Sequence, residues 1–487
     1  LKKDFRLKDH LPLKKAIEKA HQESQQLYIV YLWEDILLGS KDYDTRHWRF
    51  VRQSLDDMNA HLALYGYQII EFKGDAIEIF KHIHSKHITE VYSHEEIGID
   101  CTYKRDLELK NWFRFASISW HEYPTNAVRR GLRNRKDWNK YWYGYMHRGF
   151  DDPKLGLLND LPGMDDSYRI LSERTRNQLP SDILHDSEDF QKGGESEARK
   201  CLLSFIKERA KGYAKTISLP HESRIHNSRL SPYLAWGNLS VRQVHQSFEK
   251  FKTSDNGFDI KACHERLKWR CHFIQKFESE CRIEFENQNP YYDQLERTHD
   301  VELLEKWKKG ETGFPLVDAA MRAVNQTGWL NFRMRAMVIS FLTHYLWQHW
   351  KEGAVWLGSR FLDFEPGIHY PQVQMQAGTT GIHTVRVYNP VKQAKEKDPS
   401  GTFIKEWVPE LRKLPNVWVH EPSKCPPLEQ QFYDFEIERD YPLPIIDAAR
   451  AHQNETDRLW SLKKDKNVRR EGRRIMKTHV KPGRRWE

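Results

Sequence analysis

Hydrophobic residues follow two different periodicities along this sequence, and the change between them limits the folds that the chain can adopt. Residues 28–33 and 67–72 are continuous apolar runs with β-branched residues, as in buried parallel strands, and residues 88–96 form a third candidate strand. Residues 45–66 lie between the first two and carry apolar residues at helical spacing. Since parallel strands need such crossovers, the pattern predicts an α/β domain with a parallel sheet over residues 1–125.

Beyond residue 195 the periodicity is helical almost to the end of the sequence. One helix has a single apolar face, made by Met334, Val338, Phe341, Leu342 and Tyr345. Residues 150–195 instead hold Pro, Gly and Asp without periodicity, as interdomain connections do. We therefore predict an interdomain linker over residues 126–195 and an all-α domain with a basic C-terminal segment over residues 196–487.

Two segments are rich in Lys and Arg and are candidates for contact with nucleic acid. Between Asn126 and Arg148, Arg and Lys alternate with aromatic residues. That mixture suits a nucleic-acid surface, and it equally suits a linker whose aromatic side chains pack on a neighbouring domain, which we favour. Lys463–Glu487 has eleven Lys or Arg against three acids, so it is either a phosphate-contacting segment or a solvated basic tail.

Composition excludes several classes of protein. No stretch approaches the roughly 20 apolar residues of a membrane helix, and the N-terminus has neither a signal-peptide core nor an initiator Met. We interpret the chain as a fragment of a cytoplasmic, monomeric protein without membrane contact. The six Cys form no CxxC pair and are interpreted as reduced thiols; their number does not exclude an iron–sulfur cluster, but their spacing gives it no support. His82, His84 and His87 lack the His-x3-His spacing of helix-borne ligands, and we predict no metal site.

A polar stretch between apolar helices is the first candidate binding site. It runs from Asp363 to Gly381 and includes Glu365, His369, Gln372, Gln374 and Gln376. We interpret it as a loop that forms the floor of a cavity, the alternative being a solvated connection. Arg333 and Arg335 precede it near a helix start, and Asp363 and Glu365 are their candidate partners.

A helix start supplies the second candidate site. Ser231 followed by Pro232 predicts an N-cap and a first-turn Pro, and Asn227, Ser228 and Arg229 come just before them. Free amides, hydroxyls and a guanidinium at a helix N-terminus suit a pyrophosphate. An ordinary capped helix remains the alternative.

Several motifs resemble those of the DNA photolyases and cryptochromes. They are SRLSPYLAWGNLS, TGFPLVDAAMR, TGWLNFRMR, RVYNPVKQ and DPSGTFIKEWVPEL, in the order and spacing of that family. GGESEARKCLLSFIKER resembles the start of the family's helical FAD domain, and KKDFRLKDHLPLKKAI resembles the end of the first strand and the first helix of its antenna domain. The resemblance covers nearly the whole chain and is most specific over residues 193–411.

The resemblance implies a Rossmann-like α/β antenna domain, which in this family can hold a second chromophore of the folate or deazaflavin type, and an all-α domain that binds FAD. The residues it implies for FAD are Tyr213, Asn227, Ser228, Arg229, Leu230, Ser231, Arg270, Arg335, Asp363, Phe364, Glu365 and His369. Those implied for substrate are Trp269, Arg266, Phe332, Arg333 and Met375.

Several positions depart from the family pattern. His369 stands where photolyases commonly carry Asn facing the flavin N5, and it is interpreted either as a proton donor to a flavin radical or as a neutral hydrogen-bonding side chain. Phe332 and Arg266 replace the usual substrate-contacting Asn and Glu, and Val373 and Met375 replace two Trp.

The electron-transfer route to the flavin is also altered. Trp350 matches the middle Trp of the family's chain, whereas Arg297 falls where the distal one is expected. Electrons could instead pass through Trp347, Trp350, Trp356 or Tyr388, and the sequence does not choose among them.

The resemblance implies a light-dependent enzyme that repairs a pyrimidine lesion in DNA by electron transfer from reduced FAD. The lesion, a cyclobutane dimer or a (6-4) photoproduct, stays open. The alternative is a cryptochrome-type photoreceptor without repair activity. A long low-complexity C-terminal extension would favour that alternative, and the sequence instead ends in the basic segment with RREGRR.

Overall fold

The N-terminal region contains two pairs of parallel strands. The structure is a computed structural model and describes residues 1–84, 88–163, 166–383 and 387–480. Strand β1 (Ile29–Glu34) pairs with β2 (Ile69–Gly74), with Ile29 opposite Ile69, and β3 (Glu90–His94) pairs with β4 (Ser119–Tyr123). The α/β class predicted for this region is therefore confirmed.

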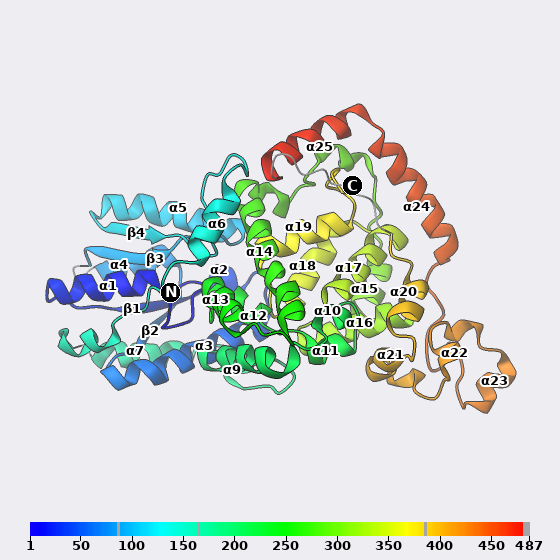
Figure 1. The fold of residues 1–487 in the computed structure, drawn as a ribbon, viewed down its shortest axis with the longest axis horizontal. Helices are drawn as coiled ribbons and strands as arrows, with labels where there is room; N and C mark the ends of the chain where they lie inside the picture. The colour runs from blue at the N-terminus through cyan, green and yellow to red at the C-terminus, as the bar shows by residue number, and fades with distance from the viewer. Residues whose placement is uncertain (85–87, 164–165, 384–386, 481–487) are drawn as a thin grey trace.

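Helices pack around the strand pairs, and one of them, α3 (Thr45–Leu62), is the helix predicted between the first two strands. These helices are α1 (Leu11–Gln22), α3 (Thr45–Leu62), α4 (Ala76–His84) and α5 (Asp100–Phe115). Figure 1 shows α5 above the β3–β4 pair and α3 below the β1–β2 pair. The inner strands β1 and β3 are not bonded to each other in the described part of the chain, and both line a cavity of about 440 Å³. His82 and His84 lie on α4, while His87 lies outside the described residues.

The segment predicted as a linker contains helices of its own. Trp138 and Trp142 of α6 (Trp138–Met146) are buried, which agrees with aromatic packing rather than an open nucleic-acid surface. Within the predicted interdomain connection, α7 (Asp166–Arg176) lies against β2. Polar bonds to Glu71 hold α7: the Glu71 backbone N–H donates to the Ser172 hydroxyl at 2.9 Å, and Arg176 Nε donates to the carboxylate at 2.8 Å. Tyr168 of α7 is also buried among apolar residues of β2, and Leu171 packs beside it, so a short apolar face adds to these polar bonds.

The C-terminal region is helical, as predicted, and is packed around long buried helices. Its helices of eight or more residues are α9 (Glu195–Ser204), α13 (Val241–Phe251), α14 (Gly257–Ser279), α15 (Val301–Lys309), α16 (Pro315–Thr327), α17 (Phe332–Ser340), α18 (Trp350–Arg360), α19 (Pro366–Gln376), α20 (Pro390–Lys397), α24 (Ala448–Lys463) and α25 (Lys466–His479). All five apolar residues of the face predicted for α17 and the turn after it are buried. Over the described residues, no helix combines the length and apolarity needed to cross a membrane. The six Cys are all free thiols.

A buried ion pair ties the N-terminal region to the helical one. Arg242 on α13 donates through Nε to Asp9 at 3.1 Å and through Nη2 to Asp151 at 2.7 Å, and Ser240 also donates to Asp9. Arg242 and Asp9 are each less than 5% exposed. Burial raises the pKa of Asp9, but the hydrogen bonds from Arg242 and Ser240 outweigh it and hold that pKa below its usual value.

Replacing Arg242 by Met should destabilise the fold, because it leaves the Asp9 carboxylate buried without its cation. We expect the free energy of unfolding in urea to fall by about 3 kcal/mol at pH 7. The stabilisation is present above the unfolded-state pKa of Asp, about 3.9, and is lost as the pH falls through the folded-state pKa. The difference between the two proteins should therefore narrow in acid.

A matched control is Glu302→Gln, which breaks an exposed pair with Lys306 on α15. That change should stay within about 0.5 kcal/mol of the unsubstituted protein. Equal destabilisation by the two substitutions would contradict a special role for the Asp9–Arg242 pair.

Candidate functional site

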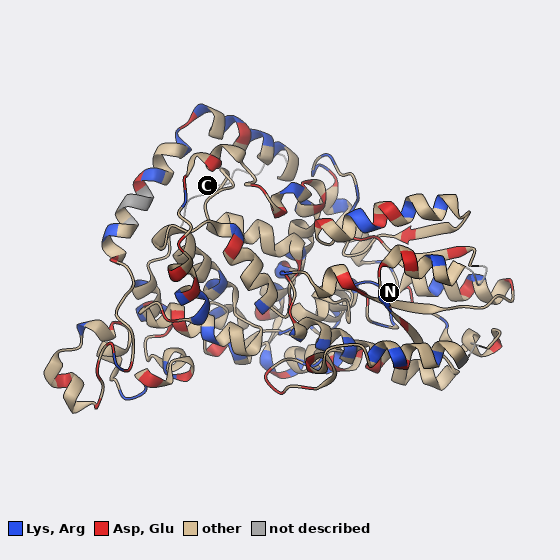
Figure 2. Ribbon diagram, turned by 180° about the vertical axis from the view of Figure 1, so that it is seen from behind, with Lys and Arg blue, Asp and Glu red and all other residues tan. Residues whose placement is uncertain are grey.

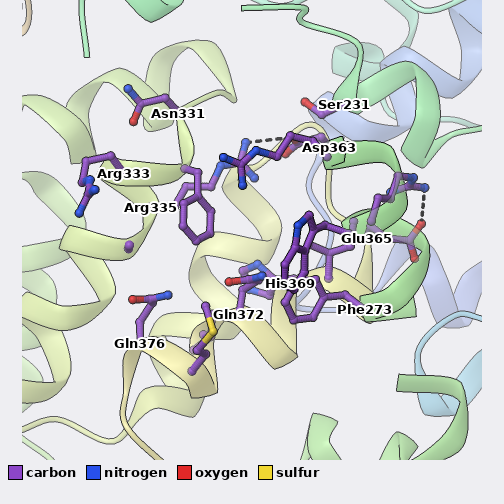
Figure 3. Close-up of a pocket in the computed structure, with 18 of the residues that line it drawn as sticks. Ser231, Phe273, Asn331, Arg333, Arg335, Asp363, Glu365, His369, Gln372 and Gln376 are labelled. Carbon is purple, nitrogen blue, oxygen red and sulfur yellow. Dashed lines mark hydrogen bonds and ion pairs between the residues drawn. The ribbon is translucent and has the colours of Figure 1, made fainter. Parts of the chain in front are cut away.

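A cavity of about 940 Å³ opens within the helical region. Its walls come from α10 (Tyr213–Thr216), the start of α12 (Ser231–Ala235), α14, α17 and α19. The volume lies at the upper end of the range, about 300–1,000 Å³, that small-molecule and cofactor sites occupy. Figure 3 shows how side chains from α14, α17 and α19 converge on this space.

The polar stretch predicted as a loop is mostly the helix α19, so that prediction is wrong. Pro366 begins the helix, a position where the fixed backbone of Pro is favoured. Gly367 allows close contact with α14, since a Cβ at this position would lie 2.8 Å from the Ile274 Cα. Four residues at helical spacing line the cavity: His369, Gln372, Val373 and Gln376. The predicted cavity wall exists, but a helix provides it.

An ion pair joins α17 to the segment before α19. Arg335 Nη2 lies 2.8 Å from Asp363 Oδ2, as Figure 3 shows, and Arg335 Nε donates to the Leu330 carbonyl at 2.9 Å. Burial raises the pKa of Asp363, but the charge and hydrogen bond of Arg335 outweigh it and hold that pKa below its usual value. Asp363 is therefore an ionised carboxylate in the cavity wall.

Glu365 pairs with Arg270 of α14, not with Arg333. The two charged groups are 3.0 Å apart and both are buried, and Arg270 also donates to the Leu234 carbonyl at 2.8 Å. The guanidinium of Arg333 instead lies 5.2 Å from the centre of the Tyr388 ring. The side chains of Arg270 and Glu365 both border the cavity. Their ion pair, the second in the site, links α14 to the start of α19.

Several buried polar atoms in the cavity wall have no hydrogen-bond partner among the described residues. They include Asp363 Oδ1, Arg270 Nε and Gln372 Oε1. An unsatisfied buried polar atom costs about 1–3 kcal/mol, so such atoms indicate a bound group that satisfies them. An acceptor-rich, donor-bearing ring such as a flavin fits this set of one carboxylate, one amide and one guanidinium.

The predicted phosphate cradle is only partly assembled. Asn227, Ser228, Leu230 and Ser231 line the cavity, together with Tyr213. The prediction that Ser231 is an N-cap is wrong, because Ser231 is the first residue of α12. The guanidinium of Arg229 does not join the cradle either. Its Nε donates to Gln191 at 3.0 Å and its guanidinium lies 4.3 Å from the centre of the Trp329 ring, because a positive φ of 56° turns the chain at this residue.

The five residues predicted to contact substrate all line the same cavity: Arg266, Trp269, Phe332, Arg333 and Met375. The Trp269 ring lies 6.0 Å from that of Phe273, with 28° between their planes. Trp350 does not border the cavity; it is buried and donates to Asn287 Oδ1 at 2.8 Å.

Sequence reasoning missed Phe273 and Lys276 in the cavity wall and Arg209 behind it. Phe273 and Lys276 continue the spacing of Arg266, Trp269 and Arg270 along one face of α14, so helical periodicity could have revealed them. Burial lowers the pKa of Lys276 to about 8. Arg209 lies outside the wall and donates to the carbonyl oxygens of Asn227 and Ser228, which no spacing signal indicates.

A separate buried cluster, Asp4, His10 and His94, has the composition of a metal site. Its hydrogen bonds favour another reading. The Leu13 N–H donates to His10 Nδ1 at 3.1 Å, so a neutral His10 carries its proton on Nε2, 3.2 Å from Asp4. His94 Nδ1 lies 2.7 Å from the same carboxylate oxygen. Both imidazoles therefore face one carboxylate oxygen, and His94 is hydrogen-bonded to it.

Comparisons with known proteins cover most of the chain. Residues 1–131 match the family model for DNA photolyase, and residues 263–461 match that for the FAD binding domain of DNA photolyase. A deoxyribodipyrimidine photo-lyase of Alkalihalophilus pseudofirmus is 27% identical over 92% of this chain and 94% of its own length. A cryptochrome DASH of Gloeobacter violaceus is also 27% identical, over 91% of each chain.

Structural comparison agrees with this assignment. A bacterial class III photolyase from Agrobacterium tumefaciens has a TM-score of 0.81 and 24% sequence identity, and the alignment covers 96% of this chain and 97% of that one. At that identity the likeness shows the fold. With both family models matched, the chain belongs to the photolyase and cryptochrome family.

Proposed function

We propose that this protein is a light-dependent DNA photolyase, a lyase that splits an ultraviolet-induced pyrimidine lesion. The observation that carries the proposal is a single cavity in which buried, partly unsatisfied polar groups meet stacking and basic side chains. FAD, when bound in its reduced form, supplies on blue-light excitation the electron that opens the lesion. The residues of the chain bind and orient both partners.

The two ion pairs support a fixed position for the flavin. Asp363 and Glu365 are each neutralised by one Arg and keep their charge in the cavity wall. The unpaired Asp363 Oδ1 and Arg270 Nε remain for a ring edge that both accepts and donates hydrogen bonds. Tyr213, Asn227, Ser228 and Ser231 would hold the phosphates and ribose.

The surroundings of His369 favour a neutral hydrogen-bonding side chain over a proton donor. The Ala354 carbonyl, 2.8 Å from Nε2, can only accept, so Nε2 carries the proton. Burial lowers the pKa of His369 to about 4. At neutral pH the imidazole is therefore uncharged and acts as a hydrogen-bonding side chain.

The cavity suits a pyrimidine lesion rotated out of the duplex. Extrusion of a damaged nucleotide costs least where stacking is already broken. Trp269 and Phe273 provide flat apolar surfaces, and Arg266 and Arg333 provide positive charge near the opening. Aromatic rings stack on bases regardless of sequence, which agrees with recognition of damage in any sequence context.

A cryptochrome-type photoreceptor without repair activity is the second candidate. The aliphatic Val373 and Met375, where relatives commonly carry Trp, favour it, because they remove stacking surface from the cavity.

An antenna chromophore of the folate or deazaflavin type is a further proposal, supported by the second cavity in the α/β region, and pigment extraction tests it. We also propose that the protein is a monomer, which size-exclusion chromatography tests, and that it is cytoplasmic, which fractionation of cells tests.

A repair assay separates the two candidates. Protein with reduced FAD, confirmed by absorption, is mixed with duplexes that carry one cyclobutane dimer or one (6-4) photoproduct and is then illuminated with blue light. We expect restoration of one lesion type and none in the dark. If neither lesion is restored, the photolyase proposal fails and the photoreceptor remains.

Asp363→Asn should weaken flavin binding, because it removes the ionised group that faces Arg335. We expect at least a tenfold rise in the dissociation constant, about 1.4 kcal/mol, measured by flavin fluorescence after refolding the protein with known amounts of FAD. Asp434→Asn, on an exposed carboxylate paired with Lys413, is the matched control and should bind FAD normally. Unchanged affinity in Asp363→Asn, with native circular dichroism, would refute this role.

His369→Asn should reduce the pH dependence of stability. Between the unfolded pKa, about 6.5, and the folded pKa the unfolded chain binds the extra proton, so stability falls as the pH falls. From pH 7.5 to pH 5 the unsubstituted protein should lose about 2 kcal/mol more than the variant. Urea unfolding at both pH values measures this. His61→Asn, on an exposed residue of α3, should leave the pH dependence as it was.

Single Phe substitutions test the electron route. Four variants are compared, with Phe in place of Trp347, Trp350, Trp356 or Tyr388. Blue-light reduction of the flavin should be slow in the variant that lacks the residue carrying the electron. Tyr388 borders the cavity and Trp350 does not, so Tyr388→Phe discriminates between a direct and a longer route. Reduction at the normal rate in all four variants would exclude this set.

A further inference from the structure

Helix α25 has two faces of opposite character. The buried face consists of Val468, Gly472, Ile475 and His479. The exposed face carries Lys466, Arg469, Arg470, Arg473 and Lys477 at helical spacing. Six basic residues and one acid occur between Lys466 and His479. The helix lies beyond residue 461, where the match to the FAD-binding family model ends, so it is a feature of this chain and not of that model.

The buried face fixes α25 firmly to the helical region. Gly472 allows close approach, because a Cβ there would lie 3.1 Å from the Gly381 carbonyl oxygen. Asn289 Nδ2 donates to the Val468 carbonyl at 3.1 Å. The helix therefore holds its exposed side chains on a rigid support.

A charge cluster at the end of α14 adds to this attachment. Glu280 pairs with Arg474 at 2.6 Å, with His479 at 2.7 Å and with Arg282 at 2.7 Å. Burial raises the pKa of Glu280, but these hydrogen bonds outweigh it and hold that pKa far below its usual value. Arg474 is thus used internally, which distinguishes it from the residues on the exposed face.

The same helix borders the large cavity. Met476, His479 and Val480 line it, together with Lys463 from the end of α24. The basic face of α25 therefore begins at the edge of the cavity. Figure 2 shows Lys and Arg along this helix at the top of the molecule.

Arg473 and Lys477 are exposed, lie one helical turn apart and form no ion pair with any residue that the structure describes. Four residues of α-helix advance about 6 Å, and one DNA strand carries a phosphate about every 3.4 Å along the axis. Two basic residues at this spacing can contact two phosphates of one strand. Unpaired like charges on a rigid helix repel each other, and a polyanion relieves that repulsion.

We propose that α25 is a DNA-binding element that holds the phosphodiester backbone beside the cavity opening, with Arg473 and Lys477 as phosphate contacts. The proposal rests on the proposed function, because the cavity beside α25 would receive the lesion. Helix α25 would then position the duplex from outside the residues that match the FAD-binding family model. Phosphate contacts of this kind fix the register of the duplex and carry no sequence information.

The test measures binding of an undamaged duplex by fluorescence anisotropy across a series of salt concentrations, in the dark. Each phosphate contact contributes about 0.9 to the slope of log K against log salt. Arg473→Gln combined with Lys477→Gln should therefore reduce the slope by about 1.8. The matched control, Lys104→Gln with Lys110→Gln on α5, removes the same charge from the α/β region and should leave the slope nearly unchanged.

Each outcome decides the proposal. A slope that equals that of the control pair overturns it, even if the protein repairs DNA. A lower slope in a protein that repairs neither lesion supports α25 as a DNA-binding element and rejects the photolyase function. Circular dichroism and flavin content should stay unchanged in the Arg473 and Lys477 variant. If that variant does not fold, Lys477→Gln alone, an exposed change at one of the two proposed contacts, should lower the slope by about 0.9.

Discussion

The close contact between α14 and α19 is the constraint on which the cavity depends. Gly367 brings the start of α19 against Ile274, where any side chain would collide with the backbone of α14. Arg270 and Glu365 then join the two helices through a buried ion pair. With the helices fixed at this point, residues that follow on α19 and residues on one face of α14 both line the cavity.

Burial of charge in those walls is tolerated because each acid has a defined cation. Isolated carboxylates in an apolar wall would take up protons. Arg335 prevents this for Asp363, whose pKa stays below its usual value although its side chain is largely buried. Since truncating one partner of such a pair costs far more than the pair contributes, these residues are retained for what they present to a ligand rather than for stability alone.

Periodicity predicted the elements that bury an apolar stripe and failed where polar contacts hold the chain. The buried faces of α3 and α17 were visible in the spacing of their apolar residues. In α19 the polar His369, Gln372 and Gln376 face the cavity, so the helix has no apolar stripe and resembles a loop in sequence. The side chain of Arg229 could not be oriented from sequence either, because its direction follows from one positive φ and from a distant partner, Gln191.

Most departures from the family pattern lie in the cavity wall. The ion pairs of Asp363 and Glu365 are present, and the cavity is lined by the residues that differ: Arg266, Phe332, His369, Val373 and Met375. Val373 and Met375 are too small to stack as Trp does, and Phe332 cannot donate a hydrogen bond as Asn does. Recognition in the cavity must then rely less on stacking and on polar contacts to the lesion. Such a loss raises the share of binding energy that phosphate contacts have to supply, and α25 places basic residues next to the opening where that energy is needed.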